Sequence, residues 1–204
     1  MTPSSNSKSI RLEPQEFLQK ALLTDTIAVD TETNGKDVRD GRGFCIGISV
    51  AIFLDNTYYS AYFPVAHDED NVEEEVKQFL FRVIVSRSRV IFHNAKFDLI
   101  SLQTAGFNLT IPIWYCTLMM THMLNENVPK GLDWLAKNEL GESGKEKPPE
   151  WQFFFTLYGW SSKFPARVMA LYACEDAVLT LKLFYRLYPF FVESGFDGSP
   201  VRRL

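Results

Sequence analysis

Short apolar runs come first along the chain, and helical spacing of apolar residues becomes dominant after them. We predict strands at residues 26–31, 44–54, 58–65, 89–92 and 114–115. We predict helices at residues 12–23, 71–86, 95–105, 117–124 and 132–140. The second and third strands are expected to form a hairpin at Asp55-Asn56. This order of elements predicts a three-layer α/β domain with a mixed sheet.

The last third of the chain combines a polar stretch with a long helical pattern. Residues 141–150 (GESGKEKPPE) are rich in Gly, Pro and charge, and we expect a mobile loop there. Pro165 is suited to the start of a helix, and Pro189 lacks the N–H that would continue one. The sequence therefore predicts a long helix between these two prolines.

Composition narrows the class of protein. The chain has 204 residues, 46% hydrophobic and 23% charged, so we expect a single domain over residues 1–204 with a flexible tail at 1–11. No apolar run is long enough to cross a bilayer, and the tail lacks the apolar segment of a secretory signal, so no membrane partner is expected. Cys45, Cys116 and Cys174 are far apart, which favours reduced thiols in a cytosolic protein over a zinc site.

The charge balance limits how the protein could contact nucleic acid. A formal net charge of −4 argues against a protein that mainly coats nucleic acid. An enzyme that grips a few nucleotides needs only local positive charge. The candidates, each equally compatible with a solvated surface, are Arg82, Arg87, Arg89, Lys145, Lys147, Lys163, Arg167, Arg202 and Arg203. The histidines, His67, His93 and His122, have no ligand spacing, and we assign them no catalytic role.

Asp30 and Glu32 lie at the end of the first predicted strand. Side chains at i and i+2 of a strand point to the same face, so the two carboxylates leave the strand together. Open α/β sheets place ligands at the carboxyl ends of such strands. The alternative is a polar strand end that runs into a turn.

Asp98 lies near the start of the helix that follows the fourth predicted strand. It falls on the same helical stripe as Ala95, Leu102 and Ala105, which is expected to face the core. A carboxylate on that stripe requires a partner. The alternative is an acid stabilised by the helix dipole.

Asp176 is the only charged residue in the apolar arc of the long C-terminal helix. That arc also contains Met169, Tyr172 and Leu183, whereas Glu175 falls on the solvated side. An unpaired buried carboxylate is costly, so Asp176 must be paired, neutralised or bound to metal. A structural salt bridge is the alternative for Asp176, and a core aromatic is the alternative for Tyr172.

These four carboxylates suggest a metal centre. Converging, they would carry a charge of about −4, which two divalent cations would cancel, and oxygen-only ligation favours Mg²⁺ or Mn²⁺ over zinc. Two such ions form a clamp for in-line phosphoryl displacement. The chemistry that this pattern indicates is phosphodiester hydrolysis.

Three motifs in this order resemble the DEDDy group of DnaQ-like 3′–5′ exonucleases. The motifs are VDTETNG (29–35), FHNAKFDL (92–99) and YACEDAVLTLKL (172–183), and residues 117–141 resemble the intervening helices of the proofreading domain of family A DNA polymerases. The likeness covers roughly residues 20–190. It implies a ribonuclease H-like fold, a mixed five-stranded sheet flanked by helices. Relatives usually have Asp where this chain has Cys116, which is not a metal-ligand position.

The resemblance also implies a role for each matching residue. Asp30, Glu32 and Asp176 would bind the first metal ion, and Asp30 would bridge to the second, which Asp98 would hold largely through water. Tyr172 would orient the attacking water. The residues implied to contact the terminal nucleotides are Asn94, Phe97 and Thr33.

The function expected from this resemblance is hydrolysis of single-stranded or frayed DNA from the 3′ end, with release of nucleoside 5′-monophosphates. A DNA polymerase is an expected partner, and bacterial cytoplasm or a phage-infected cell is the expected location. An exoribonuclease of ribonuclease D type is one alternative, with RNA as the substrate. A non-catalytic nucleic-acid or polymerase-binding module is another, although the complete acidic set argues against it.

Overall fold

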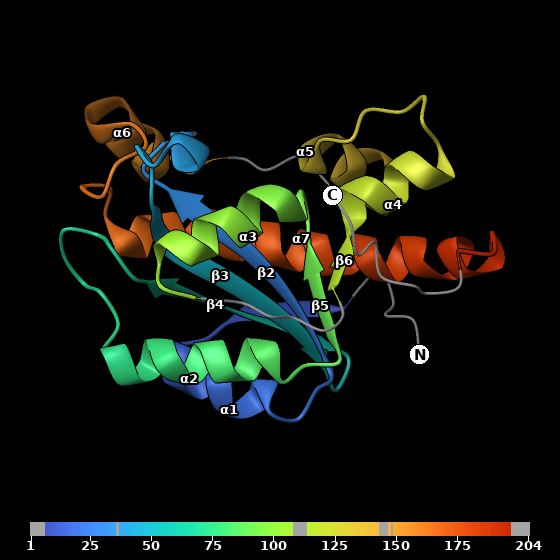
Figure 1. Cartoon of the computed structure of the whole chain (residues 1–204), viewed down its shortest axis with the longest axis horizontal. Helices are drawn as coiled ribbons and strands as arrows, with labels where there is room; N and C mark the ends of the chain where they lie inside the picture. The colour runs from blue at the N-terminus through green and yellow to red at the C-terminus, as the bar shows by residue number, and fades with distance from the viewer. Residues whose placement is uncertain (1–6, 36, 108–113, 143–146, 148, 197–204) are drawn as a thin grey trace.

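A mixed six-stranded sheet forms the centre of the protein (Figure 1). The computed structural model describes residues 7–35, 37–107, 114–142, 147 and 149–196. In spatial order the strands are β1 (Lys8–Arg11), β4 (Thr57–Pro64), β3 (Cys45–Leu54), β2 (Thr26–Thr33), β5 (Arg89–Phe92) and β6 (Trp114–Cys116). The pairs of β3 with β2 and β4 are antiparallel, and the other pairs are parallel.

The β3–β4 hairpin has the tight turn that the sequence predicts. Asp55 and Asn56 have φ values of 49° and 58°, and Leu54 pairs directly with Thr57. Positive φ at both central residues is the geometry of a type I′ turn, which Asp and Asn tolerate better than other side chains. The turn therefore fixes the register of β3 against β4.

Helices cover both faces of the sheet. One face packs against α1 (Pro14–Ala21), α2 (Glu74–Val85) and α3 (Ala95–Thr104). The other face packs against α4 (Thr117–Leu124), α5 (Leu132–Leu135) and the long α7 (Ala166–Glu193), which crosses behind the sheet in Figure 1. The remaining elements are η1 (Asp37–Asp40), the π-helical η2 (Ala136–Leu140) and α6 (Pro149–Tyr158). The three-layer α/β architecture is thus confirmed.

Pro189 does not end the long helix, contrary to the sequence-based expectation. α7 continues through it to Glu193. Proline removes one backbone hydrogen bond, but Phe191 beyond it is buried and stacks on Phe196 with ring centroids 5.1 Å apart. Burial of that aromatic pair offsets the lost hydrogen bond and keeps the last turn helical.

Two further expectations need correction. Residues 8–11, assigned to a flexible tail, form β1 and pair in parallel with β4, so the sheet has six strands rather than five. α6 begins at Pro149, inside the stretch expected to be a loop. Pro is favoured in the first turn of a helix, but the almost continuous apolar run after Trp151 has no helical alternation that would have predicted α6. Within the described residues, no helix combines the length and apolar character needed to span a membrane.

Candidate active site

The end of β2 presents two carboxylates on the sheet face that packs against α7. Asp30 pairs with Ser49 of β3 and Glu32 pairs with Gly47, and the register shifts immediately after Glu32. Ala28, two residues before Asp30, packs in the cluster formed with α7. Strand alternation therefore gives both carboxylates this orientation.

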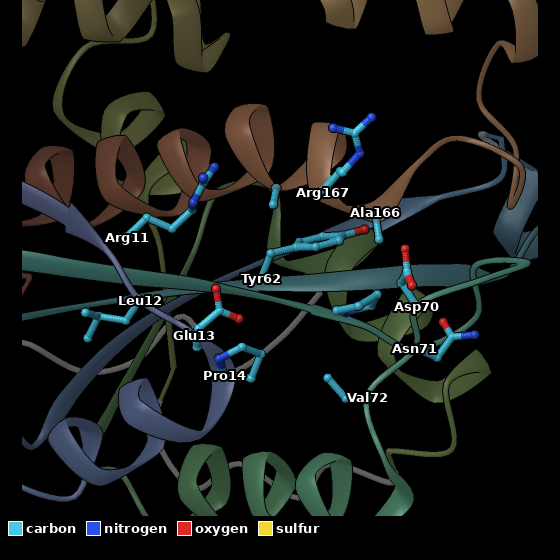
Figure 2. A pocket seen from close by; sticks show the side chains of 12 residues that line it. Arg11, Leu12, Glu13, Pro14, Tyr62, Asp70, Asn71, Val72, Ala166 and Arg167 are labelled. Atoms are coloured by element: carbon cyan, nitrogen blue, oxygen red, sulfur yellow. The ribbon is translucent and has the colours of Figure 1, made fainter.

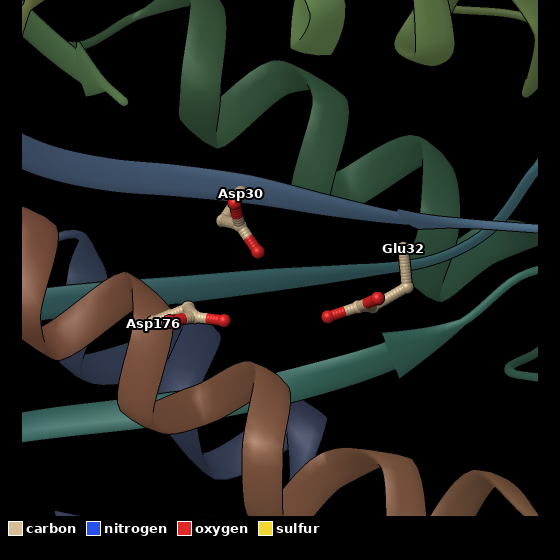
Figure 3. Close-up of side chains that lie close together, drawn as sticks. All are labelled: Asp30, Glu32 and Asp176. Atoms are coloured by element: carbon tan, nitrogen blue, oxygen red, sulfur yellow. The ribbon is translucent and has the colours of Figure 1, made fainter. Parts of the chain in front are cut away.

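Asp176 of α7 meets these two carboxylates across the sheet–helix interface. One side-chain oxygen from each of Asp30, Glu32 and Asp176 lies within 4.8 Å of the others. Figure 3 shows the three side chains converging from β2 and α7. Glu32 and Asp176 are 5% and 7% exposed, and Asp30 is half-buried. Glu32 and Asp176, 144 positions apart in the sequence, thus come together, as the place of Asp176 in the apolar arc of its helix predicts. We call Asp30, Glu32 and Asp176 the acidic group.

The acidic group fits a hard divalent cation. Two oxygens bound to one Mg²⁺ at about 2.1 Å lie at most about 4.2 Å apart. The three carboxylate oxygens already lie within 4.8 Å of one another, so binding one ion needs only small side-chain movements. The donors are all carboxylate oxygens, which favour Mg²⁺ or Mn²⁺ rather than zinc. Ser49, which is fully buried, donates its hydroxyl to Asp30 Oδ2 at 3.5 Å.

Asp98 is held beside this group but is not one of the three clustered carboxylates. It accepts hydrogen bonds from the Thr31 backbone N–H at 3.2 Å and from the Thr31 hydroxyl at 2.8 Å. Asp98, Ala95 and Leu102 are all buried, as the helical stripe predicts. Burial, and then the charge of Asp30, raises the pKa of Asp98 well above its usual range, while the Thr31 hydrogen bonds oppose that shift.

Tyr172 lies on the same helix, one turn before Asp176, among aromatic side chains. Its ring centroid is 5.7 Å from that of Trp151 and 6.4 Å from that of Trp160. Burial raises the pKa of Tyr172 well above its usual range, and the charges of Glu32 and Asp30 add to the effect. The hydroxyl therefore stays protonated at neutral pH and is available as a hydrogen-bond donor.

The three candidate substrate contacts lie on two segments. Asn94, at the start of α3, is exposed and has a left-handed backbone with φ of 69°. Its carbonyl accepts the N–H of the half-buried Phe97 at 2.9 Å. Thr33 is buried and donates its hydroxyl to the Gly35 carbonyl at 2.6 Å, which gives Thr33 a role in shaping the turn after β2.

Several of the basic candidates have local structural contacts. Arg87 donates to the carbonyls of Ala21 and Thr24 and so ties together the ends of α1 and α2. Arg167 pairs with Glu150 at 3.3 Å. Other contacts of the candidates are with aromatic rings: Arg82 with Phe79, Arg89 with Tyr188, and Lys147 with Trp151 and Tyr172. Lys145, Arg202 and Arg203 lie outside the described residues.

Sequence reasoning missed residues that support the acidic group rather than belong to it. The missed residues are Thr31, Ser49, Tyr62, His67 and Trp151. Strand alternation places Thr31 opposite its acidic neighbours, but no sequence signal pairs it with a helix far along the chain. The contacts of the others depend on how distant segments pack.

The chain matches the 3′–5′ exonuclease family over residues 9–189. It is 24% identical over 180 residues to DNA polymerase I of Borreliella burgdorferi, covering 87% of this chain and 19% of that protein. It is 28% identical over 169 residues to the DNA polymerase DpoZ of Salmonella phage PMBT28, covering 77% of this chain and 25% of that protein. The chain thus spans a quarter or less of the length of these relatives.

A solved structure supports the fold assignment. Brucella melitensis NrnC with bound Mg²⁺ superposes with a TM-score of 0.61 at 19% identity, over 92% of this chain and 83% of that chain. The shared architecture is the ribonuclease H-like α/β fold, with six strands here in its mixed sheet. The family match covers most of the chain, and the chain therefore belongs to the DnaQ-like 3′–5′ exonuclease family of hydrolytic nucleases, with family A polymerase domains among its relatives.

Proposed function

We propose that the protein hydrolyses phosphodiester bonds at the 3′ end of single-stranded or frayed DNA by a two-metal-ion mechanism and releases nucleoside 5′-monophosphates. The observation that carries this proposal is the approach of Asp30, Glu32 and Asp176 to within 4.8 Å of one another. Two of these residues come from a strand end and one from a distant helix. Such convergence of like charges is costly unless cations neutralise it.

Asp30, Glu32 and Asp176 are the proposed ligands of one Mg²⁺ or Mn²⁺ ion. Asp30 would also contact a second ion, together with Asp98, which would act largely through water. When bound, the ions lower the pKa of the attacking water and stabilise the leaving oxygen. Ser49 restrains Asp30 and Thr31 restrains Asp98, so the protein holds both carboxylates in place beforehand.

Tyr172 is proposed to orient the attacking water through its protonated hydroxyl. Its environment supports this role, because burial and the nearby carboxylates keep the phenol neutral. Asn94 and Phe97 are the proposed contacts to the terminal nucleotides, with the Phe97 ring available to stack on a base. Thr33 is the third proposed substrate contact, and its bond to the Gly35 carbonyl holds the turn after β2.

DNA is the proposed substrate because both relatives described above are DNA polymerases. A DNA polymerase is the corresponding proposed partner, and we propose that the chain forms a single exonuclease domain. The bacterial and phage origins of these relatives support action in bacterial cytoplasm or in a phage-infected cell.

The test is digestion of end-labelled single-stranded DNA in the presence of Mg²⁺ or Mn²⁺. We expect stepwise shortening from the 3′ end and release of 5′-monophosphates. Asp30→Asn should lower the rate by at least about 100-fold, because a ligand shared between two ions loses its charge. Glu175→Gln, which alters an exposed acid beside Asp176 in sequence, is the matched control and should retain activity.

Two results would contradict the proposal. Faster digestion of a matched RNA would replace DNA with RNA as the substrate, because the 2′-hydroxyl is what distinguishes them. Absence of cleavage, together with no Mn²⁺ binding by calorimetry, would instead favour a non-catalytic binding module.

A further inference from the structure

Tyr62 lies on the same sheet face as the acidic group, two strands away from it. Its position in β4 pairs with Ser49 of β3, which in turn pairs with Asp30 of β2. The Tyr62 side chain is buried and extends over Gly47, the residue that pairs with Glu32. A Cβ at Gly47 would lie 1.8 Å from the Tyr62 hydroxyl oxygen. The absent side chain of Gly47 therefore makes room for this hydroxyl.

The Tyr62 hydroxyl begins a buried hydrogen-bond chain through His67. The hydroxyl lies 2.7 Å from His67 Nε2, and His67 Nδ1 lies 2.7 Å from the carbonyl oxygen of Phe164. A carbonyl can only accept, so Nδ1 carries the proton, and a neutral ring then accepts the Tyr62 proton at Nε2. Burial lowers the pKa of His67, which supports the neutral ring that this assignment requires.

This chain of bonds ends at the start of the helix that carries Asp176. Phe164 precedes Pro165, whose carbonyl accepts the N–H groups of Val168 and Met169 in the first turn of α7. Figure 2 shows the Tyr62 ring extending toward Ala166, in that same turn, along one wall of a surface pocket. His67 is itself fixed by Asn71, which accepts its backbone N–H at 2.8 Å and donates to its carbonyl at 2.6 Å.

We call the hydrogen bonds from Tyr62 through His67 to the Phe164 carbonyl the link. The link joins the sheet to α7, the two elements that supply the clustered carboxylates. On one side, Tyr62 contacts the β3 residue paired with Glu32. On the other side, His67 holds the carbonyl at the entry to α7, whose later turns carry Tyr172 and Asp176. A shift of α7 along the sheet would break these bonds. The link thus sets the distance between the helix and the strand across the acidic group.

We propose that Tyr62 and His67 are positioning residues that hold the start of α7 against the sheet, so that Asp176 and Tyr172 are aligned with Glu32 for metal binding and hydrolysis. The proposal rests on the function proposed above. Neither residue contacts the reacting atoms; each acts through the placement of α7. Partners that orient ligands in this indirect way affect metal affinity as well as rate.

The experiment compares Tyr62→Phe with Tyr58→Phe in the whole chain. Tyr58 is a matched control because it is buried on the same strand and the same sheet face, but packs with the C-terminal half of α7 and with Phe53. Each variant loses one hydroxyl and keeps its ring. Folding is checked by thermal denaturation, Mn²⁺ affinity by calorimetry, and kcat and KM on single-stranded DNA at saturating Mn²⁺.

We expect Tyr62→Phe to lower Mn²⁺ affinity and kcat by about tenfold or more, with KM changed less, because the lost bond loosens ligands rather than substrate contacts. Tyr58→Phe should leave both values unchanged. A Tyr62→Phe protein that is folded, binds Mn²⁺ as wild type does and keeps its kcat would overturn the proposal. So would a lower melting temperature with unchanged affinity and kcat, since that is a purely structural effect.

A double-variant comparison tests whether the two residues act as one unit. His67→Leu breaks the link at its centre, so adding Tyr62→Phe to it should cost little further Mn²⁺ affinity. Losses that multiply would contradict a shared link. Because calorimetry needs no turnover, a wild-type protein that binds Mn²⁺ but degrades no DNA would refute the proposed function, while the affinity comparison would still decide the positioning role.

Discussion

Thr31 donates both its backbone N–H and its hydroxyl to the carboxylate of Asp98, at 3.2 Å and 2.8 Å. Thr31 lies between Asp30 and Glu32 on β2, and strand alternation turns its side chain to the opposite face. One short segment therefore presents two carboxylates to α7 and holds a third on α3. These two hydrogen bonds fix α3 against β2 on the sheet face opposite α7.

Thr31→Val tests the importance of that contact. Valine keeps the shape and the backbone donor but removes the hydroxyl, so the buried Asp98 loses one hydrogen-bond partner. We expect a loss of about 1–3 kcal/mol in the free energy of unfolding and a roughly tenfold decrease in exonuclease rate. Denaturant unfolding and steady-state kinetics measure the two effects.

Thr180→Val is the matched control for this substitution. Thr180 is fully buried on α7, and its hydroxyl has no hydrogen-bond partner among the described residues. Removing an unpartnered hydroxyl should be neutral or should stabilise the protein by up to about 1 kcal/mol. Equal losses in the two variants would mean that the Thr31 hydroxyl has no specific role.

The periodic parts of the chain could be predicted from the sequence, and the parts that depend on tertiary packing could not. Strand alternation places Asp30 and Glu32 on one face, and helical angles place Asp98 and Asp176 inside the protein. β1 could not be predicted, because Lys8–Arg11 is mostly exposed and gains its structure only by pairing with β4.

The contacts that support the acidic group could not be predicted from the sequence either. The link from Tyr62 through His67 spans residues 62–164 and depends on the loop before α7 lying against β4. Histidine spacing, the signal used to exclude a catalytic role, detects metal ligands and says nothing about a single buried hydrogen bond. Likewise, α6 could not be predicted because apolar residues occupy both of its sides. Trp151 is buried against Phe164 and Tyr172, whereas Phe153 and Leu157 are exposed to solvent.

Asp176→Asn should separate stability from activity. It removes one of three clustered negative charges, and like charges a few ångströms apart repel by up to about 4 kcal/mol at an effective dielectric constant of about 20. We expect a higher melting temperature than wild type in EDTA at pH 8, together with an exonuclease rate lower by at least about 100-fold.

Added Mn²⁺ should reverse the order of stability. Wild type should gain more in melting temperature than Asp176→Asn, because a ligand that binds only the native state stabilises it more the tighter it binds. Glu175→Gln, on the exposed side of α7, should follow wild type in both conditions. An Asp176→Asn protein less stable than wild type in EDTA would show that Asp176 is a structural ion-pair partner.

Gly47→Ala tests the close approach of Tyr62. The new methyl group would overlap the Tyr62 hydroxyl, at 1.8 Å, and would have to displace the ring. Overpacking of this kind costs about 1–3 kcal/mol, and displacement of Tyr62 should also reduce Mn²⁺ affinity. Gly131→Ala is the control, because nothing lies within 4 Å of a Cβ there and its φ of −67° suits alanine. Equal stability of the two variants would contradict the described packing.

The neutral state of His67 gives the fold a specific response to acid. Burial lowers its pKa below the usual value, while the Phe164 carbonyl and the charges of Asp68 and Asp70 oppose that shift, and Tyr62 faces its other nitrogen. The unfolded chain therefore binds a proton at a higher pH than the folded chain, so this contribution to stability is complete above about pH 6.5 and is lost as the pH falls toward the folded-state pKa. The added slope cannot exceed about 1.4 kcal/mol per pH unit, the limit for one proton.

Denaturant unfolding in EDTA between pH 7.5 and 5.5 should show a steeper loss of stability for wild type than for His67→Gln, whereas the exposed His122→Gln should keep the wild-type slope. Parallel slopes for wild type and His67→Gln would mean that folding leaves the pKa of His67 unchanged and would contradict this prediction. A shallower loss for wild type than for His67→Gln would mean that the native state holds His67 protonated, and the direction of its bond with Tyr62 would then be reversed.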